Sequence, residues 1–315
     1  MHPEKPHDKF FKEAFSRLDI TSDFLQAYLP HSLLENLDFA SLRQETDSYT
    51  DEQLSEHFAD LVFSAQFGDQ PIRITLLLEH KSYTEPYPHF QLNRYLLAIW
   101  ERQIRQRTAL TPVLPVVLYH GRGRWQKRPA DQYFGKLAPE LMPFIPAFDY
   151  VLIDLTDINR KLPALTSDYA RLTGLLLQYS RRKRDLMRIL DEHAQIIRTL
   201  ALSAPGRTFV STTLVYLNWA SGLTPVEIIT IFERISTQAG ELAMSAAQTW
   251  INQGLSQGLE QGLTQGIEQG LTQGLERGIR GMVKLGMDAK TIAAALDMSQ
   301  TDVDTIIARI NAESR

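Results

Sequence analysis

Two neighbouring segments of alternating apolar and polar residues constrain the fold of this chain more than any other feature. Residues 60–67 alternate with period two, and residues 72–81 do the same. The four residues between them, Gly68-Asp69-Gln70-Pro71, are of types that favour turns and suit a four-residue hairpin loop. We therefore expect an antiparallel hairpin in which Phe67 pairs with Ile72.

This register would bring three charged residues together. It places Asp60, which follows Phe58-Ala59, opposite Glu79, with Lys81 further along the same face. Directly opposed residues lie roughly 4.5–5.5 Å apart at Cβ, where two carboxylates repel unless one is protonated or a cation lies between them. The pattern predicts a binding site for a divalent cation, with a lysine beside it that orients a water molecule. Metal-dependent cleavage of phosphodiesters requires such an arrangement. The alternative is that these are solvated groups at a strand end.

Composition narrows the class of protein. The chain has 315 residues, of which 43% are hydrophobic and 22% charged, as in ordinary globular proteins. It has no cysteine, which excludes disulfides, thiol catalysis and cysteine-ligated metal sites. No apolar signal segment or membrane-spanning run is evident in the sequence, so we expect a cytoplasmic protein.

Basic residues must be concentrated locally if the protein binds DNA, because its net charge is −4. One cluster consists of Arg102, Arg105, Arg107, Arg122, Arg124, Lys127 and Arg128, and a second is the run Arg181-Arg182-Lys183-Arg184. Each could equally be a solvated charged face.

Residues 1–157 are predicted to form a mixed α/β core. Helical periodicity covers residues 8–29 in two pieces, the second capped by Thr21 or Ser22, and residues 89–107. Besides the hairpin, strands are expected at residues 38–47, 113–119 and 150–155. Pro115 favours an edge position or a bulge for its strand.

Residues 158–250 are predicted to be wholly helical. The candidate segments are Ala164–Tyr179, Arg184–Ala201 and Leu223–Gly240. They would pack on the core or link it to the tail.

Residues 251–280 contain a Gly-Leu-x-Gln repeat with a period of four. Its glycines are 254, 258, 262, 266, 270, 274 and 278, and an apolar residue follows each. In a helix of 3.6 residues per turn, the apolar stripe drifts by about 40° per repeat. Each glycine costs a helix roughly 1 kcal/mol relative to alanine, so a lone helix is not expected. The segment is interpreted either as an oligomerisation stalk or as a flexible linker.

Residues 281–315 are predicted to form a small unit resembling a helix-turn-helix. Ile292, Leu296, Val303 and Ile306 would face inward. Asp302 and Asp304 on the second helix would repel DNA phosphates, which favours protein association over DNA reading.

These motifs together resemble the recombination-promoting nuclease (Rpn) family, also called transposases, within the PD-(D/E)XK nuclease superfamily. The resemblance rests on His7-Asp8-Lys9-Phe10-Phe11-Lys12, Leu37-Asp38-Phe39, Tyr49-Thr50-Asp51-Glu52, residues 57–63, Leu77-Leu78-Glu79-His80-Lys81-Ser82, Arg94-Tyr95, Ile99-Trp100-Glu101 and residues 115–121. It covers roughly the first half of the chain, and the glycine-rich repeat and terminal unit also resemble the tails of that family.

The resemblance implies a restriction-endonuclease-like core, with a mixed central sheet flanked by helices, followed by an all-helical region and a helical tail. It implies a DNA endonuclease that uses Mg²⁺, with Mn²⁺ or Ca²⁺ as alternatives, in recombination or in defence against foreign DNA. Asp60 and Glu79 would bind the metal and Lys81 would be the catalytic lysine. The family often has Gln in place of Lys81, so this chain is nearer the superfamily pattern.

Further residues enter through the same resemblance. Gln91, Arg94 and Tyr95 match the Q-x-x-x-Y motif of some nucleases in the superfamily and would contact the substrate, although Tyr95 could simply pack. His80 is interpreted as a structural group beside the site. Asp8 or Glu13 of the first helix would supply a third acid.

Three other interpretations remain open. The chain could be a transposase with strand-transfer activity, or a non-catalytic DNA-binding or oligomerisation protein whose tail is the working part. The tail could also mediate homo-oligomerisation and be made separately from an internal start such as Met244, so that a shorter product of the same gene restrains the full-length chain.

Overall fold

The computed structural model describes residues 6–45, 59–79, 86–121 and 123–313. The chain divides into two compact units, Met1–Ala247 and Gln248–Arg315. None of the helices in the described part of the chain is both long and apolar enough to cross a membrane.

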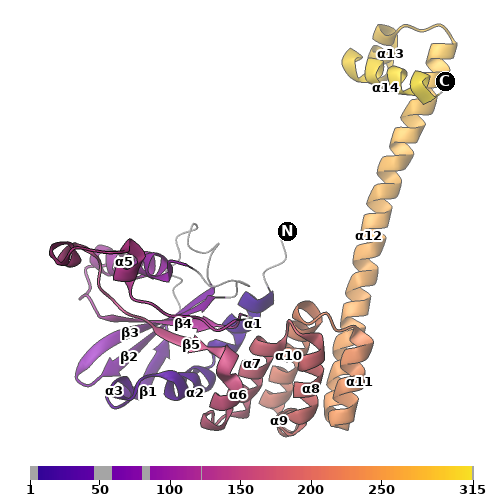
Figure 1. Ribbon diagram of the computed structural model, residues 1–315. Helices are drawn as coiled ribbons and strands as arrows, with labels where there is room; N and C mark the ends of the chain where they lie inside the picture. Colours follow the sequence, from indigo (N-terminus) through magenta and orange to yellow (C-terminus); the bar gives the residue numbers. More distant parts are fainter. Residues whose placement is uncertain (1–5, 46–58, 80–85, 122, 314–315) are drawn as a thin grey trace. The chain divides into compact units, whose positions relative to one another are not determined.

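A sheet of five described strands forms the centre of the first unit (Figure 1). Its order follows the chain: β1 (Leu37–Gln44), β2 (Ala59–Phe67), β3 (Gln70–Glu79), β4 (Val113–Tyr119) and β5 (Val151–Asp154). The first three strands are antiparallel, whereas β3, β4 and β5 run parallel to one another. The mixed α/β architecture predicted from the sequence is therefore present.

The hairpin between β2 and β3 is tighter than predicted. Phe67 pairs with Gln70 rather than with Ile72, which leaves only Gly68-Asp69 as the loop. Gly68 has a φ of 56°, a conformation that glycine adopts without steric cost and that two-residue hairpin loops require. The predicted four-residue loop was wrong because Gln70 and Pro71 both belong to β3, paired with Phe67 and Gln66. Pro71 lacks a backbone N–H, but Gln70 keeps its own.

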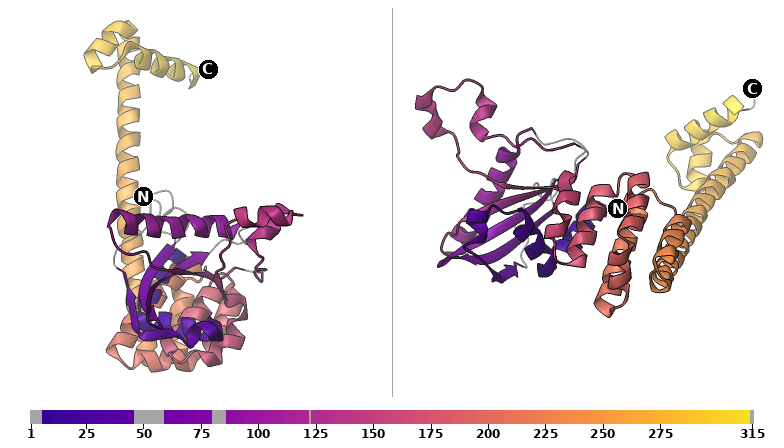
Figure 2. Two further views of the ribbon diagram at one scale, coloured as in Figure 1. Left: turned by 90° about the vertical axis from the view of Figure 1, so that its left-hand side faces the viewer. Right: turned by 60° about the horizontal axis from the view of Figure 1, so that its bottom comes forward.

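The two faces of the sheet are covered by different helices. The face carrying Phe63, Ile74 and Leu118 is completely buried at these positions. On this side the strands contact α1 (Pro6–Phe15) and α2 (Leu18–Tyr28). The opposite face packs against α5 (Pro88–Arg105), so that Figure 2 shows α5 and α2 on opposite sides of the strands.

The structure refines two predictions in this core, the start of the second helix and the position of Pro115. The break between α1 and α2 lies near Arg17, because Thr21 is inside α2 and donates its hydroxyl to the carbonyl of Phe15 at 2.6 Å. Pro115 lies in β4, an internal strand, but pairs only with Thr75, since pairing with β5 begins at Val116. At Pro115 the strand is therefore locally an edge, which agrees with the lack of an N–H.

The short α3 (His31–Leu34) lies between α2 and β1. The helices that follow β5 are α6 (Ile158–Lys161), α7 (Asp168–Tyr179), α8 (Lys183–Glu192), α9 (Ala194–Ala201), α10 (Ala204–Ala220) and α11 (Pro225–Ile235). The helix α10 lies in the region predicted to be wholly helical but was not among its candidate segments. The expected helix over residues 184–201 is split at His193. Pro205 at the start of α10 suits the first turn of a helix, and Ser203 caps it by accepting from the N–H of Gly206.

The glycine repeat lies in one continuous helix, α12 (Thr237–Lys284), contrary to the expectation from its glycine content. A Cβ placed at any of the glycines from 254 to 278 would meet nothing within 4 Å. Close packing within the described chain therefore does not offset the cost of these glycines.

The last two helices form a small core with the end of α12. They are α13 (Ala289–Leu296) and α14 (Gln300–Glu313), joined by a turn at Asp297, whose φ is 53°. Ile279, Ile292 and Val303 are fully buried there, and Leu296 and Ile306 pack beside them, as predicted.

Candidate active site

The predicted acids belong to the end of the hairpin, but their register differs from the prediction. Asp60 pairs with Leu77, two residues before Glu79, so the two acidic positions are diagonal rather than directly opposite. A shift of two residues keeps both positions in the same alternation set. Diagonal positions of this kind are separated by about 7–8 Å. His80 and Lys81 lie outside the described residues.

The register with β4 relates these positions to α5. Leu77 pairs with Val117, and Glu79 pairs with Tyr119. Val117 and Tyr119 form a buried cluster with Leu92 and Tyr95 of α5. The sheet positions of Asp60 and Glu79 and the helix α5 therefore belong to the same face of the sheet.

The three predicted substrate residues of α5 have different environments. Tyr95 is almost completely buried, which fits a packing role. Gln91 is half-buried, and its Oε1 atom is buried without a hydrogen bond to any described residue. Arg94 is exposed. Arg94 and Gln91 therefore retain groups for a substrate, whereas Tyr95 fixes the helix on the sheet.

The first turn of α1 lies close to the end of β4. The rings of His7 and His120 are 5.0 Å apart, and His120 directly follows Tyr119, the partner of Glu79. Asp8 is half-buried next to His7. Glu13 instead lines a cavity between α1 and α10. Of the two predicted candidates for a third acid, Asp8 is the neighbour in sequence of the histidine that meets the end of β4.

A polar chain that sequence reasoning missed connects α1 to the later helices. Tyr216 of α10 lies 2.7 Å from Nδ1 of His7 and 2.8 Å from Oγ of Ser180. Arg181 donates through Nε to Nε2 of His7 at 3.2 Å, so in the neutral ring Nδ1 carries the proton and donates to Tyr216. Burial raises the pKa of the Tyr216 phenol, which keeps it protonated. No local signal joins His7 to a residue 209 positions away.

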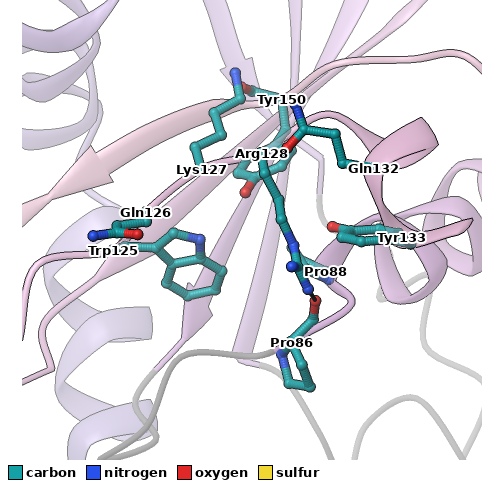
Figure 3. A pocket seen from close by; sticks show the side chains of 9 residues that line it. All are labelled: Pro86, Pro88, Trp125, Gln126, Lys127, Arg128, Gln132, Tyr133 and Tyr150. Atoms are coloured by element: carbon teal, nitrogen blue, oxygen red, sulfur yellow. Dashed lines mark hydrogen bonds between the residues drawn. The ribbon is translucent and has the colours of Figure 1, made fainter. Parts of the chain in front are cut away.

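The first predicted basic cluster is only partly free for a ligand. Lys127 pairs with Asp149 at 2.6 Å, and Arg128 donates to the carbonyl of Pro86 at 3.1 Å. Both line a pocket with Trp125, Tyr133 and Tyr150 (Figure 3). Arg122 lies outside the described residues. In the second cluster, Lys183 pairs with Glu227 at 2.8 Å.

No group of three or more His, Asp or Glu residues arranged to hold a metal occurs among the residues with described side chains. The side chains of Asp60 and Glu79 are outside that set. The predicted metal site thus depends on the strand register alone.

Comparison with known proteins gives the family. The model for the family described as "Putative transposase, YhgA-like" matches residues 5–206. This chain belongs to that family. The YhgA-like match includes the sheet, α1, α5 and the first turn of α10, and ends before the glycine repeat.

Relatives of this YhgA-like chain carry nuclease names. It is 29% identical to the recombination-promoting nuclease RpnD of Escherichia coli O157:H7 over 62% of its own length and 75% of the relative. It is 28% identical to the recombination-promoting nuclease RpnC of Escherichia coli K12 over 61% of its length, and it spans 64% of that relative.

A further relative is named as an inactive protein. The inactive recombination-promoting nuclease-like protein RpnE of Escherichia coli K12 is 31% identical over 37% of this chain and 39% of the relative. No solved structure matches the chain.

Proposed function

We propose that this protein is a metal-dependent DNA endonuclease with a PD-(D/E)XK-type core. The observation that carries the proposal is the strand register, which puts the Asp60 and Glu79 positions in one alternation set at the end of a buried hairpin. The nuclease names of RpnD and RpnC support it. We expect it to act in the cytoplasm, in recombination or in defence against foreign DNA.

The donor set fits a hard divalent cation. Asp60 and Glu79 would hold Mg²⁺ or Mn²⁺ through carboxylate oxygens, and Ca²⁺ could occupy the same site. The ion, when bound, would lower the pKa of a water and offset charge on the phosphate.

The remaining residues have separate roles in this proposal. Lys81 would orient the attacking water and hold a positive charge near the transition state. Arg94 would contact a backbone phosphate, and Asp8 would be the third acid. Gln91 would donate or accept one hydrogen bond to the substrate, while Tyr95 fixes α5 on the sheet.

The test is cleavage of supercoiled plasmid with Mg²⁺, Mn²⁺ or EDTA by the full-length protein, Asp60→Ala and Glu79→Ala. Loss of one metal ligand should lower the rate by more than about 100-fold, since outer-shell changes already cost 10- to 100-fold. Asp69→Ala, in the exposed loop at the other end of the same hairpin, is the matched control and should cleave normally. Wild-type rates in both site variants would refute the assignment.

A transposase activity is the second candidate, because the family description contains that word. It requires strand transfer as well as cleavage. Incubation of the protein with labelled transposon-like ends and a target plasmid distinguishes the two. A nuclease produces cut DNA without joined products, whereas a transposase produces covalent joints.

We further propose that the chain associates with itself through α12. The apolar repeat residues Leu255, Leu259, Leu263, Ile267 and Leu271 are between 53% and 70% exposed. Leu275 and Ile279 continue the same stripe, and both pack in the core that α13 and α14 make with α12. The repeat thus already supports helix packing where a partner is present. Light scattering should give an oligomer for the wild type and a smaller species for Leu259→Glu with Leu263→Glu.

A shorter product of the same gene would have a natural starting point in this arrangement. Met244 lies just before Gln248, where the second compact unit begins, and that unit has a core of its own. An antibody against the C-terminal helices should detect a short chain beside the full-length one. Replacing Met244 by Leu should remove the short chain only.

A further inference from the structure

The pocket beside Trp125 has aromatic walls. Trp125, Tyr133 and Tyr150 line it, and Pro86 and Pro88 form its lower side (Figure 3). Its volume is about 380 Å³, which lies within the range of small-ligand sites. Flat aromatic rings beside proline rings offer the surfaces on which a planar ring system can stack.

Two basic residues, Lys127 and Arg128, lie at the edge of this pocket and bond to its walls. The Arg128 guanidinium lies 4.8 Å from the centre of the Tyr133 ring and donates to the carbonyl of Pro86. The Lys127 ammonium donates to the carbonyl of Tyr150 at 2.6 Å. Both residues are exposed, but Lys127 is paired with Asp149 at 2.6 Å, so Arg128 supplies the positive charge that a phosphate at the edge of the pocket would meet.

A buried hydroxyl in the pocket wall keeps hydrogen-bonding capacity. Tyr150 is only 2% exposed, and its hydroxyl makes no hydrogen bond of acceptable geometry to a described residue. The hydroxyl is directed into the space between Trp125 and Arg128 (Figure 3). The indole of Trp125 interacts with this hydroxyl and can only donate to it, so the O–H of Tyr150 remains available to a ligand or a water.

Two amide side chains complete the polar lining. Gln126 and Gln132 are both exposed and both line the pocket. Each carries an acceptor and two donors, the combination that side-chain amides use against the edges of bases. A simple anion would need neither these amides nor the aromatic walls.

The pocket adjoins the proposed catalytic centre. Tyr119 pairs with Glu79 across the sheet, and its ring meets the Trp125 ring edge-on with centroids 5.0 Å apart. The backbone N–H of Trp125 donates to Asp154 of β5 at 3.1 Å, which fixes the segment against the sheet. A polynucleotide bound at the end of β3 would therefore pass close to this pocket.

We propose that this pocket binds one unpaired nucleobase of the DNA substrate next to the phosphodiester that is cut, an inference that rests on the proposed nuclease function. Stacking on the aromatic rings would hold the base, the Tyr150 hydroxyl and the two glutamines would bond its edge, and Arg128 would meet its phosphate. A base inside a regular duplex must first be extruded, so the protein should prefer single-stranded or bulged DNA to a perfect duplex.

The experiment measures binding of the full-length protein in EDTA, where no metal-dependent cleavage occurs. Three fluorescent probes are compared: a 12-nucleotide strand with a central 2-aminopurine, its perfect duplex, and a duplex in which the 2-aminopurine is bulged. The bulged and single-stranded probes should bind more tightly, and their 2-aminopurine fluorescence should be quenched by stacking. Equal affinity for the three probes without quenching would overturn the proposal.

Two gentle variants test the pocket itself. Tyr150→Phe removes only the buried hydroxyl, and Gln132→Ala removes one exposed amide. Each should weaken binding of the bulged probe by about 2- to 10-fold, the effect of one hydrogen bond, and leave perfect-duplex binding unchanged. Tyr169→Phe on α7 and Gln195→Ala on α9 are the matched controls. Wild-type affinity and quenching in both pocket variants would reject the site.

The same set of measurements separates this inference from the nuclease proposal. Cleavage that depends on Asp60, without any preference for an unpaired base, would refute the pocket alone. A preference for the bulged probe that Tyr150→Phe reduces, in a protein that never cleaves, would refute the nuclease and retain the base site. Displacement of all DNA probes by a proline-rich peptide, with no quenching, would assign the pocket to a peptide and overturn the proposal.

Discussion

The β2–β3 hairpin and the repeat of α12 both carry a periodic apolar pattern, yet the apolar side chains of the two patterns have opposite environments. In the hairpin, Phe63, Ile74 and Leu76 are at most 1% exposed. In α12, Leu255 and Leu263 are 63% and 67% exposed. The kind of residue is the same, so the difference must come from the geometry of the pattern and from what covers it.

Periodicity explains the difference. A period of two puts the alternating apolar residues of a strand on one face, which a layer of helices can cover completely. A period of four in an α-helix drifts by about 40° per repeat, so no single straight neighbour can cover the stripe. Among the apolar residues of the repeat, all of them described, Leu275 and Ile279 are the two that pack against α13 and α14. A periodic pattern predicts an element, whereas burial requires a partner of matching shape.

The largest expected effect comes from emptying the sheet core. Phe63→Ala removes a fully buried ring from the centre of the hairpin. It should lower the free energy of unfolding by about 3–5 kcal/mol, measured by urea denaturation. A loss below about 1 kcal/mol would mean that the hairpin face is less tightly packed than the structure describes.

The second effect compares glycines in two helices. Gly262→Ala with Gly266→Ala adds methyl groups where nothing lies within 4 Å, so the helix should gain about 2 kcal/mol from propensity. Gly174→Ala in α7 is the comparison variant in a packed environment, because its new Cβ would lie 2.7 Å from Cδ1 of Ile158. Overpacking costs about 1–3 kcal/mol, so this variant should melt at a lower temperature than the first. Circular dichroism at 222 nm measures both.

The double glycine variant also tests the proposed self-association. If glycines permit close contact between α12 helices, added methyl groups should weaken the oligomer while stabilising the single helix. Light scattering on the same samples separates the two effects. An unchanged oligomer would show that the glycines are not at the contact.

The third effect is an acid-sensitive link between α8 and α11 in the first unit. The hydrogen bond from Lys183, together with the N–H of Thr224, lowers the pKa of Glu227 to about 2. Because the folded-state pKa is below the unfolded value of about 4.5, the stabilisation is fully present above pH 4.5 and is lost as the pH falls toward 2. Glu227→Gln keeps the cap but removes the charge. The urea midpoints of wild type and variant should differ at pH 6 and converge near pH 2.

The smallest expected effect is Leu263→Ala in the tail. At protein concentrations where chains are separate, it should change the free energy of unfolding by less than about 0.5 kcal/mol, since the side chain is exposed. At high concentration it should weaken association. A loss of several kcal/mol in the dilute sample would contradict the exposed stripe and would make the tail resemble the hairpin.

The sequence by itself determined the local elements, because each rests on a periodicity or on a turn residue. Alternation located β2 and β3, the apolar run located β4, and helical spacing located α5, all within a few residues of the observed ends. The motif string also indicated the family, which the match over residues 5–206 bears out. The helix α10 was not singled out because its buried face includes Gly206 and Thr213, whereas the apolar Val215 and Trp219 are exposed, which blurs the apolar periodicity.

Only the tertiary structure decided how these elements meet. The register of Asp60 and Glu79 depends on a loop of two residues rather than four, a choice made by pairing along the whole hairpin. The contact of His7 with Tyr216 joins positions 209 residues apart. The pocket beside Tyr150 combines three separate segments of the chain. Local periodicity reports on neighbours in sequence, whereas such contacts follow from the packing of complete helices and strands against one another.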